Sequence, residues 1–367
     1  MSTFFKRFTN NQEFIVTKKK TQKKSSLKKI FSIFIVLLIL AAAGLGIFYY
    51  YVFGPNTTSP TEGFYLYIPT GAPFSQVMDS LEKNHILKNA ASFSRLAERK
   101  GYTMKVKSGR YLITNNMSNN SLVNMLRAGK QSPVNLTFNS IRTITQLAGR
   151  LSTTIETDSL SLLKYLKDPE NSRKYGFTPQ TVLLMFIPNT YEVYWNTAPS
   201  KLFERMNQEY RRFWNSERRK LSENIGLTAI QVGVLASIVE METNKADEKP
   251  VVAGVYMNRI QRGIALQADP TVIFALGDFS IKRVLQKDLE FNSPYNTYKH
   301  QGLPPGPIAM PSVSSLESVL NYKRHNYLFF CAKPDLSGYH SFAPTLAKHM
   351  ANARAYQNAL DKMNIKH

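Results

Sequence analysis

The feature that most limits how this chain can fold is an uncharged run of 24 residues, from Ile30 to Phe53. A helix of this length reaches roughly 36 Å, which is enough to cross a bilayer core of about 30 Å. Three consecutive tyrosines, residues 49–51, lie at its far end, where membrane helices commonly carry aromatic side chains. The sequence therefore predicts a single N-terminal transmembrane helix at residues 30–53.

The residues before this helix are strongly basic. Residues 1–29 hold nine Lys and Arg against one Glu. Because positive flanks stay in the cytoplasm, the sequence predicts a basic cytoplasmic tail, a single-pass protein of the plasma (inner) membrane, and an extracytoplasmic (periplasmic-side) remainder. The alternative is a cleaved signal peptide, since the alanines at 41–43 imitate a cleavage site. The apolar run continues well past those alanines, which favours an uncleaved anchor.

Charge and cysteine content narrow the classes of partner. The formal net charge is +22, and about +14 remains beyond residue 29, as expected of a protein that meets an anionic polymer or membrane surface. No zinc-ligand spacing, phosphate-binding loop or aromatic-basic motif accompanies this charge, so nucleic acid is not expected as a partner. Cys331 is the single cysteine, which excludes an intramolecular disulfide. The six histidines show no metal spacing, and no cofactor is expected.

Beyond the membrane helix the pattern predicts two folded parts of an α+β protein. Residues 54–61 have the composition of a linker, with Pro, Thr and Ser and no apolar pattern. Residues 62–132 predict a small βααβ subdomain, with strands at 64–68 and 106–113 and helices at 73–81, 92–100 and 121–128. Residues 133–367 predict a larger mixed α/β domain, which includes a strand at 133–138 and helices at 144–151, 200–219 and 346–363.

A strongly apolar helix is predicted at residues 228–243. Thr228 and Gln231 form a capping box at its start. Apolar residues then fall on nearly every side of the helix, which is typical of a buried element. Glu240 and Glu242 lie at its end.

Glu240 is the residue of this helix most suited to chemistry. Ser237, Ala236 and Gly233 share its face, and small side chains beneath a carboxylate are expected to leave a cleft. A carboxyl group against apolar walls prefers its neutral form and can act as a general acid. Glu242 lies about 200° further around the helix and is expected to pair with a basic neighbour. The alternative for Glu240 is a helix-end glutamate that faces solvent.

Several multi-residue motifs follow the helix in a fixed order. They are KPVVAGVYMNRIQRG (249–263), LQADPTVIFALG (266–277), SPYNTYKHQGLPPGPIAMPS (293–312) and FFCAKPDLSGYHSF (329–342). Together with the preceding helix, this series resembles the endolytic murein transglycosylases of the MltG (YceG-like) family. The resemblance runs from the membrane segment to the C-terminus and is densest at residues 235–311.

The resemblance implies a lytic transglycosylase that cleaves the MurNAc–GlcNAc β-1,4 bond within peptidoglycan glycan strands and leaves a 1,6-anhydroMurNAc end. It identifies Glu240 as the acid/base and places a catalytic domain at residues 133–367, preceded by a LysM-like subdomain. The expected partners are glycan strands and the lipid bilayer, with peptidoglycan synthases as candidates that the sequence does not identify. The substrate-facing side chains that it implies are Asn258, Gln267, Asp269, Thr271, Tyr295, Asn296 and Thr297.

Two alternatives to this function remain open from the sequence. One is a muramidase-type hydrolase on the same scaffold, for which Asp269 is the best second carboxylate, although Asp269 equally suits a turn before Pro270. The other is a non-catalytic cell-wall-binding or division scaffold protein. The block FIPNTYEVYW (186–195) also departs from the family pattern, because Asn189 stands where an Asp is usual.

Overall fold

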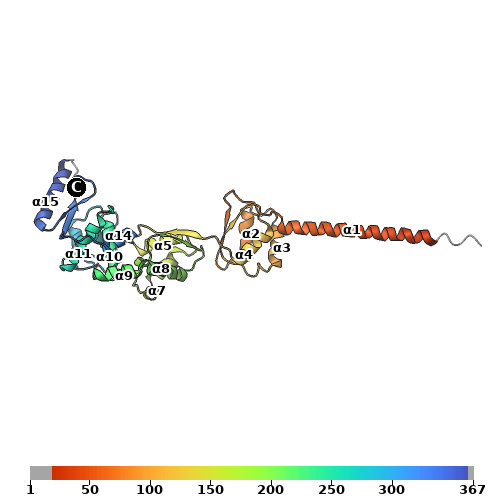
Figure 1. Cartoon of the computed structure of the whole chain (residues 1–367), viewed down its shortest axis with the longest axis horizontal. Coiled ribbons are helices and arrows are strands. Elements are labelled where there is room, and N and C mark those ends of the chain that lie inside the picture. The colour runs from red at the N-terminus through yellow and green to blue at the C-terminus, as the bar shows by residue number, and fades with distance from the viewer. Residues whose placement is uncertain (1–18, 363–367) are drawn as a thin grey trace, which may run out of the picture. The chain divides into compact units, whose positions relative to one another are not determined.

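The computed structural model describes residues 19–362, with side chains from residue 27 onward. The chain forms two compact units, unit 1 up to Gln131 and unit 2 from Ser132 (Figure 1). Most of the predicted cytoplasmic tail lies outside the described residues.

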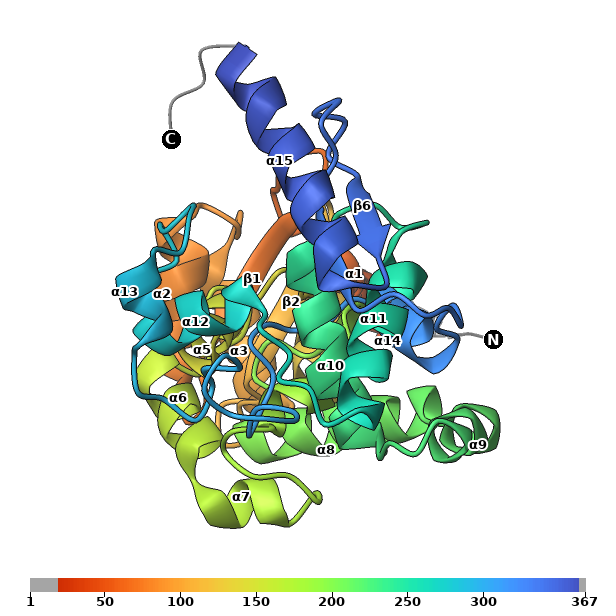
Figure 2. The same cartoon turned by 90° about the vertical axis from the view of Figure 1, so that its left-hand side faces the viewer.

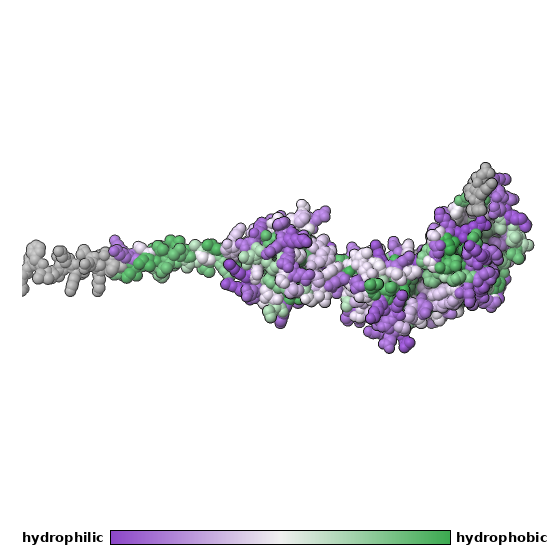
Figure 3. All heavy atoms as spheres, turned by 180° about the vertical axis from the view of Figure 1, so that it is seen from behind, coloured by the Kyte–Doolittle hydropathy of each residue, from purple (hydrophilic) through white to green (hydrophobic). Residues whose placement is uncertain are grey.

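The predicted apolar helix is present as α1 (Lys19–Phe53). Its most apolar part, Leu27–Phe53, has a mean hydropathy of 2.8, and its side chains are almost all exposed. Figure 3 shows mostly hydrophobic residues along the face of this helix that is turned to the viewer. An apolar helix of 27 residues without a covering protein layer has the length and surface that a bilayer span requires.

Unit 1 has the predicted succession of strand, two helices, strand and helix. Its elements are β1 (Phe64–Ile68), α2 (Phe74–Lys83), α3 (Ala90–Arg99), β2 (Gly109–Ile113) and α4 (Asn119–Ala128). The two strands pair antiparallel, with Leu66 opposite Tyr111, and the helices cover a core that includes Phe93 and Leu122.

Residues 54–61, predicted as a linker, are joined to unit 1 at residues 55–57. Asn56 and Thr57 are buried, and Pro55 and Thr57 form isolated bridges to Ser118 and Leu87. Asn56 donates from Nδ2 to the Asn119 side chain at 2.6 Å. Polar composition suggested a solvated segment, but these polar groups find hydrogen-bond partners inside unit 1.

Unit 2 is a mixed assembly of helices with two antiparallel strand pairs, β3–β4 and β5–β6. Its first half contains β3 (Val134–Thr137), α5 (Ile144–Ser152), α6 (Ser159–Lys167), α7 (Pro169–Arg173), the 3-10 helix η1 (Val182–Met185), β4 (Thr190–Val193), α8 (Pro199–Phe213) and α9 (Ser216–Asn224). Its second half contains α10 (Ala229–Glu242), α11 (Lys249–Gln261), α12 (Asp269–Leu276), α13 (Gln286–Leu289), α14 (Val313–Leu320), β5 (Phe329–Ala332), β6 (His340–Ala343) and α15 (Leu346–Lys362).

The prediction of a single helix at residues 200–219 is wrong in extent, because the helix is interrupted between α8 and α9. Trp214 ends α8 and is buried, and Asn215 begins α9 by accepting a hydrogen bond from the backbone N–H of Arg218 at 2.9 Å. The Asn cap was available in the sequence, but basic residues at 211–212 and 218–219 lie on both sides of it and suggested one continuous helix.

Helix α10 lies in the core of unit 2 and packs against α11 and α14 (Figure 2). The predicted capping box is confirmed: Thr228 Oγ1 accepts from the Gln231 N–H at 3.2 Å, and Gln231 Oε1 accepts from the Thr228 N–H at 2.9 Å. Residues 232–239 are all buried. After a partly exposed first turn the helix is thus enclosed, and it emerges from the core again at its last turn, where Glu240 and Glu242 lie.

Candidate active site

The face of α10 beneath Glu240 is closely packed. The Ser237 hydroxyl donates to the Val234 carbonyl at 2.6 Å and accepts from the Ile308 N–H at 3.0 Å. A Cβ placed on Gly233 would lie 2.8 Å from a methyl carbon of Leu184. The small residues therefore allow neighbouring segments to approach the helix, and the cleft predicted under Glu240 is not formed there.

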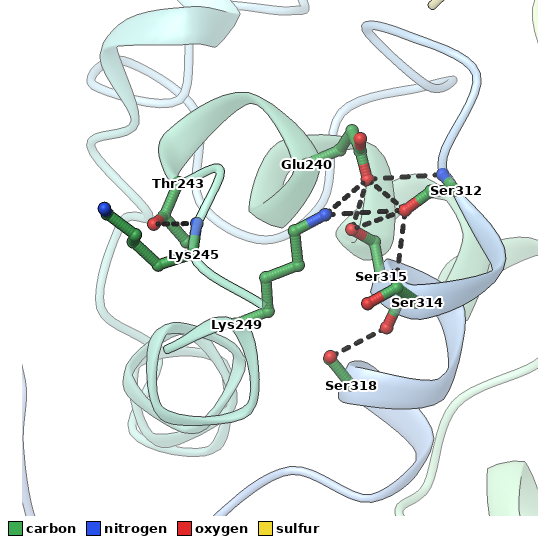
Figure 4. A network of polar contacts seen from close by, with 8 residues as sticks. All are labelled: Glu240, Thr243, Lys245, Lys249, Ser312, Ser314, Ser315 and Ser318. Carbon is green, nitrogen blue, oxygen red and sulfur yellow. Dashed lines mark hydrogen bonds and ion pairs between the residues drawn. The ribbon is translucent and has the colours of Figure 1, made fainter. Parts of the chain in front are cut away.

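Glu240 is the centre of a charged network that joins three helices (Figure 4). Its Oε2 accepts hydrogen bonds from Lys249 Nζ at 2.9 Å, from Ser312 Oγ at 2.5 Å and from Ser315 Oγ. Burial raises the pKa of Glu240, but these hydrogen bonds and the charge of Lys249 outweigh it and leave the pKa below its usual value. The expectation of a neutral, proton-holding carboxyl at Glu240 is therefore wrong.

A cavity of about 360 Å³ opens in unit 2 on another side of α10. It is lined by Glu242, Tyr256, Arg259, Leu266, Gln267, Asp269, Tyr298, Leu328, Phe329, Phe330, Leu346, His349 and Met350. These residues come from α10, α11, the start of α12, β5 and α15, and from the loops that hold Gln267, Tyr298 and Leu328. Glu242 lines this cavity, and Glu240 does not.

Glu242 has the properties that the sequence suggested for Glu240. Burial raises the pKa of Glu242 to about 7, opposed by a hydrogen bond from the Tyr256 phenol and reinforced by the negative charge of Asp269. The carboxyl is densely surrounded by protein atoms, yet it keeps some access to solvent through the cavity. A group with this pKa is present in both protonation states near neutral pH, so it can donate a proton and later accept one. The expected basic partner of Glu242 is replaced by Tyr256.

Asp269 brings a second carboxylate to the cavity wall. Its Oδ1 accepts from the Tyr298 hydroxyl at 2.5 Å. Burial raises the pKa of Tyr298, as do the hydrogen bond and charge of Asp269, so the phenol keeps its proton. The position is fixed because Asp269 begins α12 immediately before Pro270.

Arg259 holds the segment that precedes Asp269. Its Nη1 donates to Gln267 Oε1 at 3.1 Å and to the carbonyl of Leu266 at 3.0 Å, and its Nε donates to the carbonyl of Leu328 at 2.7 Å. Gln267 has φ of +53°, a left-handed conformation that few non-glycine residues adopt. Arg259 thus fixes one cavity wall, including the predicted residue Gln267.

Of the seven predicted substrate-facing residues, Gln267 and Asp269 line the cavity and the other five do not. Asn258 donates to the carbonyls of His325 and Tyr327, at 2.8 and 2.9 Å, and so fixes the chain before β5. Tyr295 packs on Phe274, with ring centroids 4.7 Å apart.

The remaining three predicted residues are buried hydrogen-bond partners. The hydroxyls of Thr271 and Thr297 are 2.8 Å apart and are shielded from solvent. Asn296 donates to the carbonyls of Leu289 and Phe291, both at 2.8 Å. Their positions support the fold around α12 and offer no contact to a molecule in the cavity.

Most of the cavity wall was not predictable from the sequence. Tyr256, Arg259 and Tyr298 lie inside the recognised motifs, and His349 and Met350 lie on the closing helix α15. The sequence did contain one sign that Glu242 has a raised pKa. Leu235, Ile238 and Val239 share its face of α10, and a carboxyl above bulky apolar side chains is the arrangement that raises a pKa. Among residues 19–362, no group of three or more His, Cys, Asp or Glu is placed to hold a metal ion.

The chain is similar to proteins of one family over most of its length. The YceG-like family model matches residues 66–355. The endolytic murein transglycosylase of Bacillus subtilis (strain 168) is 28% identical over 299 residues, which cover 77% of this chain and 81% of that protein. The protein of the same name from Streptococcus pneumoniae (strain D39) is 27% identical over 304 residues, which cover 72% of this chain and 53% of that protein. A crystal structure of a YceG-like protein from Listeria monocytogenes aligns with a TM-score of 0.52 at 28% identity, covering 80% of this chain and 99% of that one. The chain therefore belongs to the YceG-like family.

Proposed function

We propose that this protein is a membrane-anchored endolytic peptidoglycan transglycosylase that uses Glu242 as its acid/base. The observation that carries the proposal is the position of the Glu242 carboxyl in the wall of a cavity of about 360 Å³, where burial raises its pKa to about 7. The relatives named endolytic murein transglycosylase support this substrate and reaction, because they match most of the chain. The substrate is the MurNAc–GlcNAc β-1,4 bond inside a glycan strand.

The reaction needs one group that gives and then takes a proton. Protonated Glu242 donates to the glycosidic oxygen as the bond from that oxygen to the MurNAc anomeric carbon breaks. The 6-hydroxyl oxygen of the same sugar then bonds to the anomeric carbon, and its proton passes to the Glu242 carboxylate. The ring becomes a 1,6-anhydro sugar, no water is consumed, and Glu242 returns to its starting state.

Neighbouring groups support both states of Glu242. Tyr256 donates to its carboxyl and holds it in the cavity wall. The Asp269 carboxylate favours positive charge, so it stabilises an anomeric carbon that becomes cationic as the bond breaks. Phe329 and Phe330 form part of the cavity wall and give a bound sugar apolar surface to pack against.

Asp269 is also the observation that favours the second candidate, a muramidase-type hydrolase, because a second carboxylate can activate water. Mass spectrometry of products from purified uncrosslinked glycan strands distinguishes the two. We expect fragments that end in 1,6-anhydroMurNAc. Reducing ends, heavier by one water, would replace the transglycosylase with a hydrolase, and uncut strands would support a scaffold protein.

We propose that α1 crosses the plasma membrane, with the N-terminus in the cytoplasm and residues 54–367 outside it. The lysines that precede residue 30 support this orientation, and the exposed apolar surface of α1 supports the crossing. We also propose that cleavage terminates the elongation of glycan strands beside peptidoglycan synthases. A separate proposal is that the β1–β2 pair and the helices α2, α3 and α4 of unit 1 form a LysM-like subdomain. The succession β1, α2, α3, β2 is the support for the LysM-like assignment.

The pH dependence of the reaction is expected to move when Tyr256 is changed to Phe. Because Glu242 must be protonated to act as the acid, kcat/KM should fall as pH rises through about 7. The Tyr256 hydrogen bond lowers the pKa of Glu242, so its removal should move this descending limb to higher pH. The measurement is a pH profile of kcat/KM. Tyr295→Phe, outside the cavity, should leave the limb in place, and a limb unmoved by Tyr256→Phe would contradict the assignment.

A further inference from the structure

The part of unit 1 that follows α1, residues 54–131, is fixed to the outer end of that helix. Asn119, at the start of α4, donates from Nδ2 to the carbonyl of Tyr51 at 2.8 Å. Val52 is buried although most of α1 is exposed, and Pro55 forms a bridge to Ser118. The chain thus passes from the apolar helix directly into hydrogen bonds and packing within unit 1. If α1 crosses a bilayer, unit 1 is held at the membrane surface.

The sequence of α1 sets how deep its residues lie. The uncharged stretch begins after Lys29, and a bilayer core of about 30 Å takes roughly 20 residues of helix. The outer boundary of the hydrocarbon therefore falls near Tyr49, so Phe48 lies where acyl chains meet headgroups. The tyrosines that follow lie in the headgroup layer, as aromatic belts do.

Helix α3 places an arginine at that depth. It lies beside α1 (Figure 1), and the guanidinium carbon of Arg99 is 5.9 Å from the ring centroid of Phe48. Arg95 lies one turn earlier on the same face of α3. Both arginines are exposed, and no carboxylate of the described residues pairs with either. Lys100 differs, because its ammonium donates to Asn120 and Asn124.

We propose that the face of α3 formed by Arg95 and Arg99 binds lipid phosphates of the outer leaflet. A guanidinium donates two parallel hydrogen bonds to a phosphate, and its long stem can lie along apolar surface while its head reaches the phosphates. Two arginines one turn apart, at the depth of the headgroups and without protein anions, meet these requirements. The part of unit 1 that follows α1 then lies on the membrane surface. It is held there by the lipid contacts of α3 as well as by α1. The inference rests on the proposed membrane anchoring.

The test measures depth in the full-length protein. Cys331→Ser removes the native thiol, and Glu98→Cys places a nitroxide on α3 while keeping both arginines. The protein is reconstituted into vesicles of phosphatidylcholine with phosphatidylglycerol, and collisions with oxygen and with a water-soluble nickel chelate give the depth. We expect the label at 98 to lie at the phosphate layer. A label at Phe34 should lie in the hydrocarbon, and one at Arg211, exposed on α8, should lie in water.

The outcomes separate this inference from the anchoring proposal. A label at 34 in hydrocarbon with a label at 98 as open to the chelate as that at 211 would overturn the phosphate contact alone. A label at 34 open to the chelate would overturn the anchoring and this inference with it.

Two charge-matched double variants test whether the arginines of α3 bind the lipid phosphates. Arg95→Gln with Arg99→Gln should raise chelate collisions at position 98 severalfold in vesicles that contain phosphatidylglycerol. Arg211→Gln with Lys220→Gln removes the same charge from exposed sites of unit 2 and should change nothing at position 98. An unchanged depth in the arginine variant would show that these side chains do not bind phosphate and would overturn the proposal.

Discussion

Glu242→Gln is expected to lower kcat for glycan cleavage by at least the roughly 10²- to 10⁴-fold that general acid–base catalysis contributes. The amide keeps the volume of the carboxyl and can still accept from Tyr256, but it has no proton to transfer. A single group acts as both acid and base in the proposed reaction, so the upper end of that range is expected. Folding should be little affected, because the parent carboxyl is itself often protonated near pH 7. The measurement is the rate at which uncrosslinked strands yield 1,6-anhydro ends.

Glu240→Gln is the matched comparison for this experiment. Its position is two residues away on the same helix, yet its carboxylate contacts Lys249, Ser312 and Ser315 outside the cavity. It should lower the amount of folded protein more than the turnover of each folded molecule. A comparable rate for Glu242→Gln and the parent would remove Glu242 from the mechanism. A turnover lost only at Glu240 would return the acid/base role to the residue that the sequence motif suggested.

The two glutamates show what the sequence of one helix can establish. The capping box and apolar pattern predicted α10 and its burial, since both depend on residues a few positions apart. The angle between Glu240 and Glu242 was also predictable from helix geometry. Which of their two faces borders a cavity depends on segments far along the chain. Ser312 and Ser315 close one side, and Phe329 and the α15 residues build the other.

The polar motif residues show a second limit. Thr271, Asn296 and Thr297 have the side chains that bind sugar hydroxyls, and the same side chains satisfy buried backbone groups. The sequence pattern is the same in both cases, because each use requires an amide or hydroxyl at a fixed position. Only the three-dimensional arrangement separates them from Gln267 and Asp269, which line the cavity.

Lys249→Met is expected to destabilise unit 2 by roughly 3 kcal/mol, the lower end of the range for breaking a buried ion pair. The Lys249 side chain is 8% exposed and that of Glu240 is 27% exposed, so the remaining carboxylate is partly but not fully hydrated. The two hydroxyls of Ser312 and Ser315 would be its main remaining partners. Urea unfolding followed by tryptophan fluorescence reports on unit 2 alone, because Trp195 and Trp214, the two tryptophans of the chain, both lie there.

Two further variants test whether charge is the cause. Glu240→Met combined with Lys249→Met removes both charges and should recover much of the lost stability, because replacing a whole buried pair by apolar groups is often near neutral. Lys201→Met removes a lysine from an exposed pair with Glu204, where solvent screens the attraction, and should change the unfolding midpoint little. An unfolding midpoint for Lys249→Met equal to that of the parent would contradict the stabilising role of the pair. If the double variant recovers stability and keeps its turnover, Glu240 and Lys249 join α10, α11 and α14 without acting on the substrate, and the chemistry of the last turn of α10 belongs to Glu242.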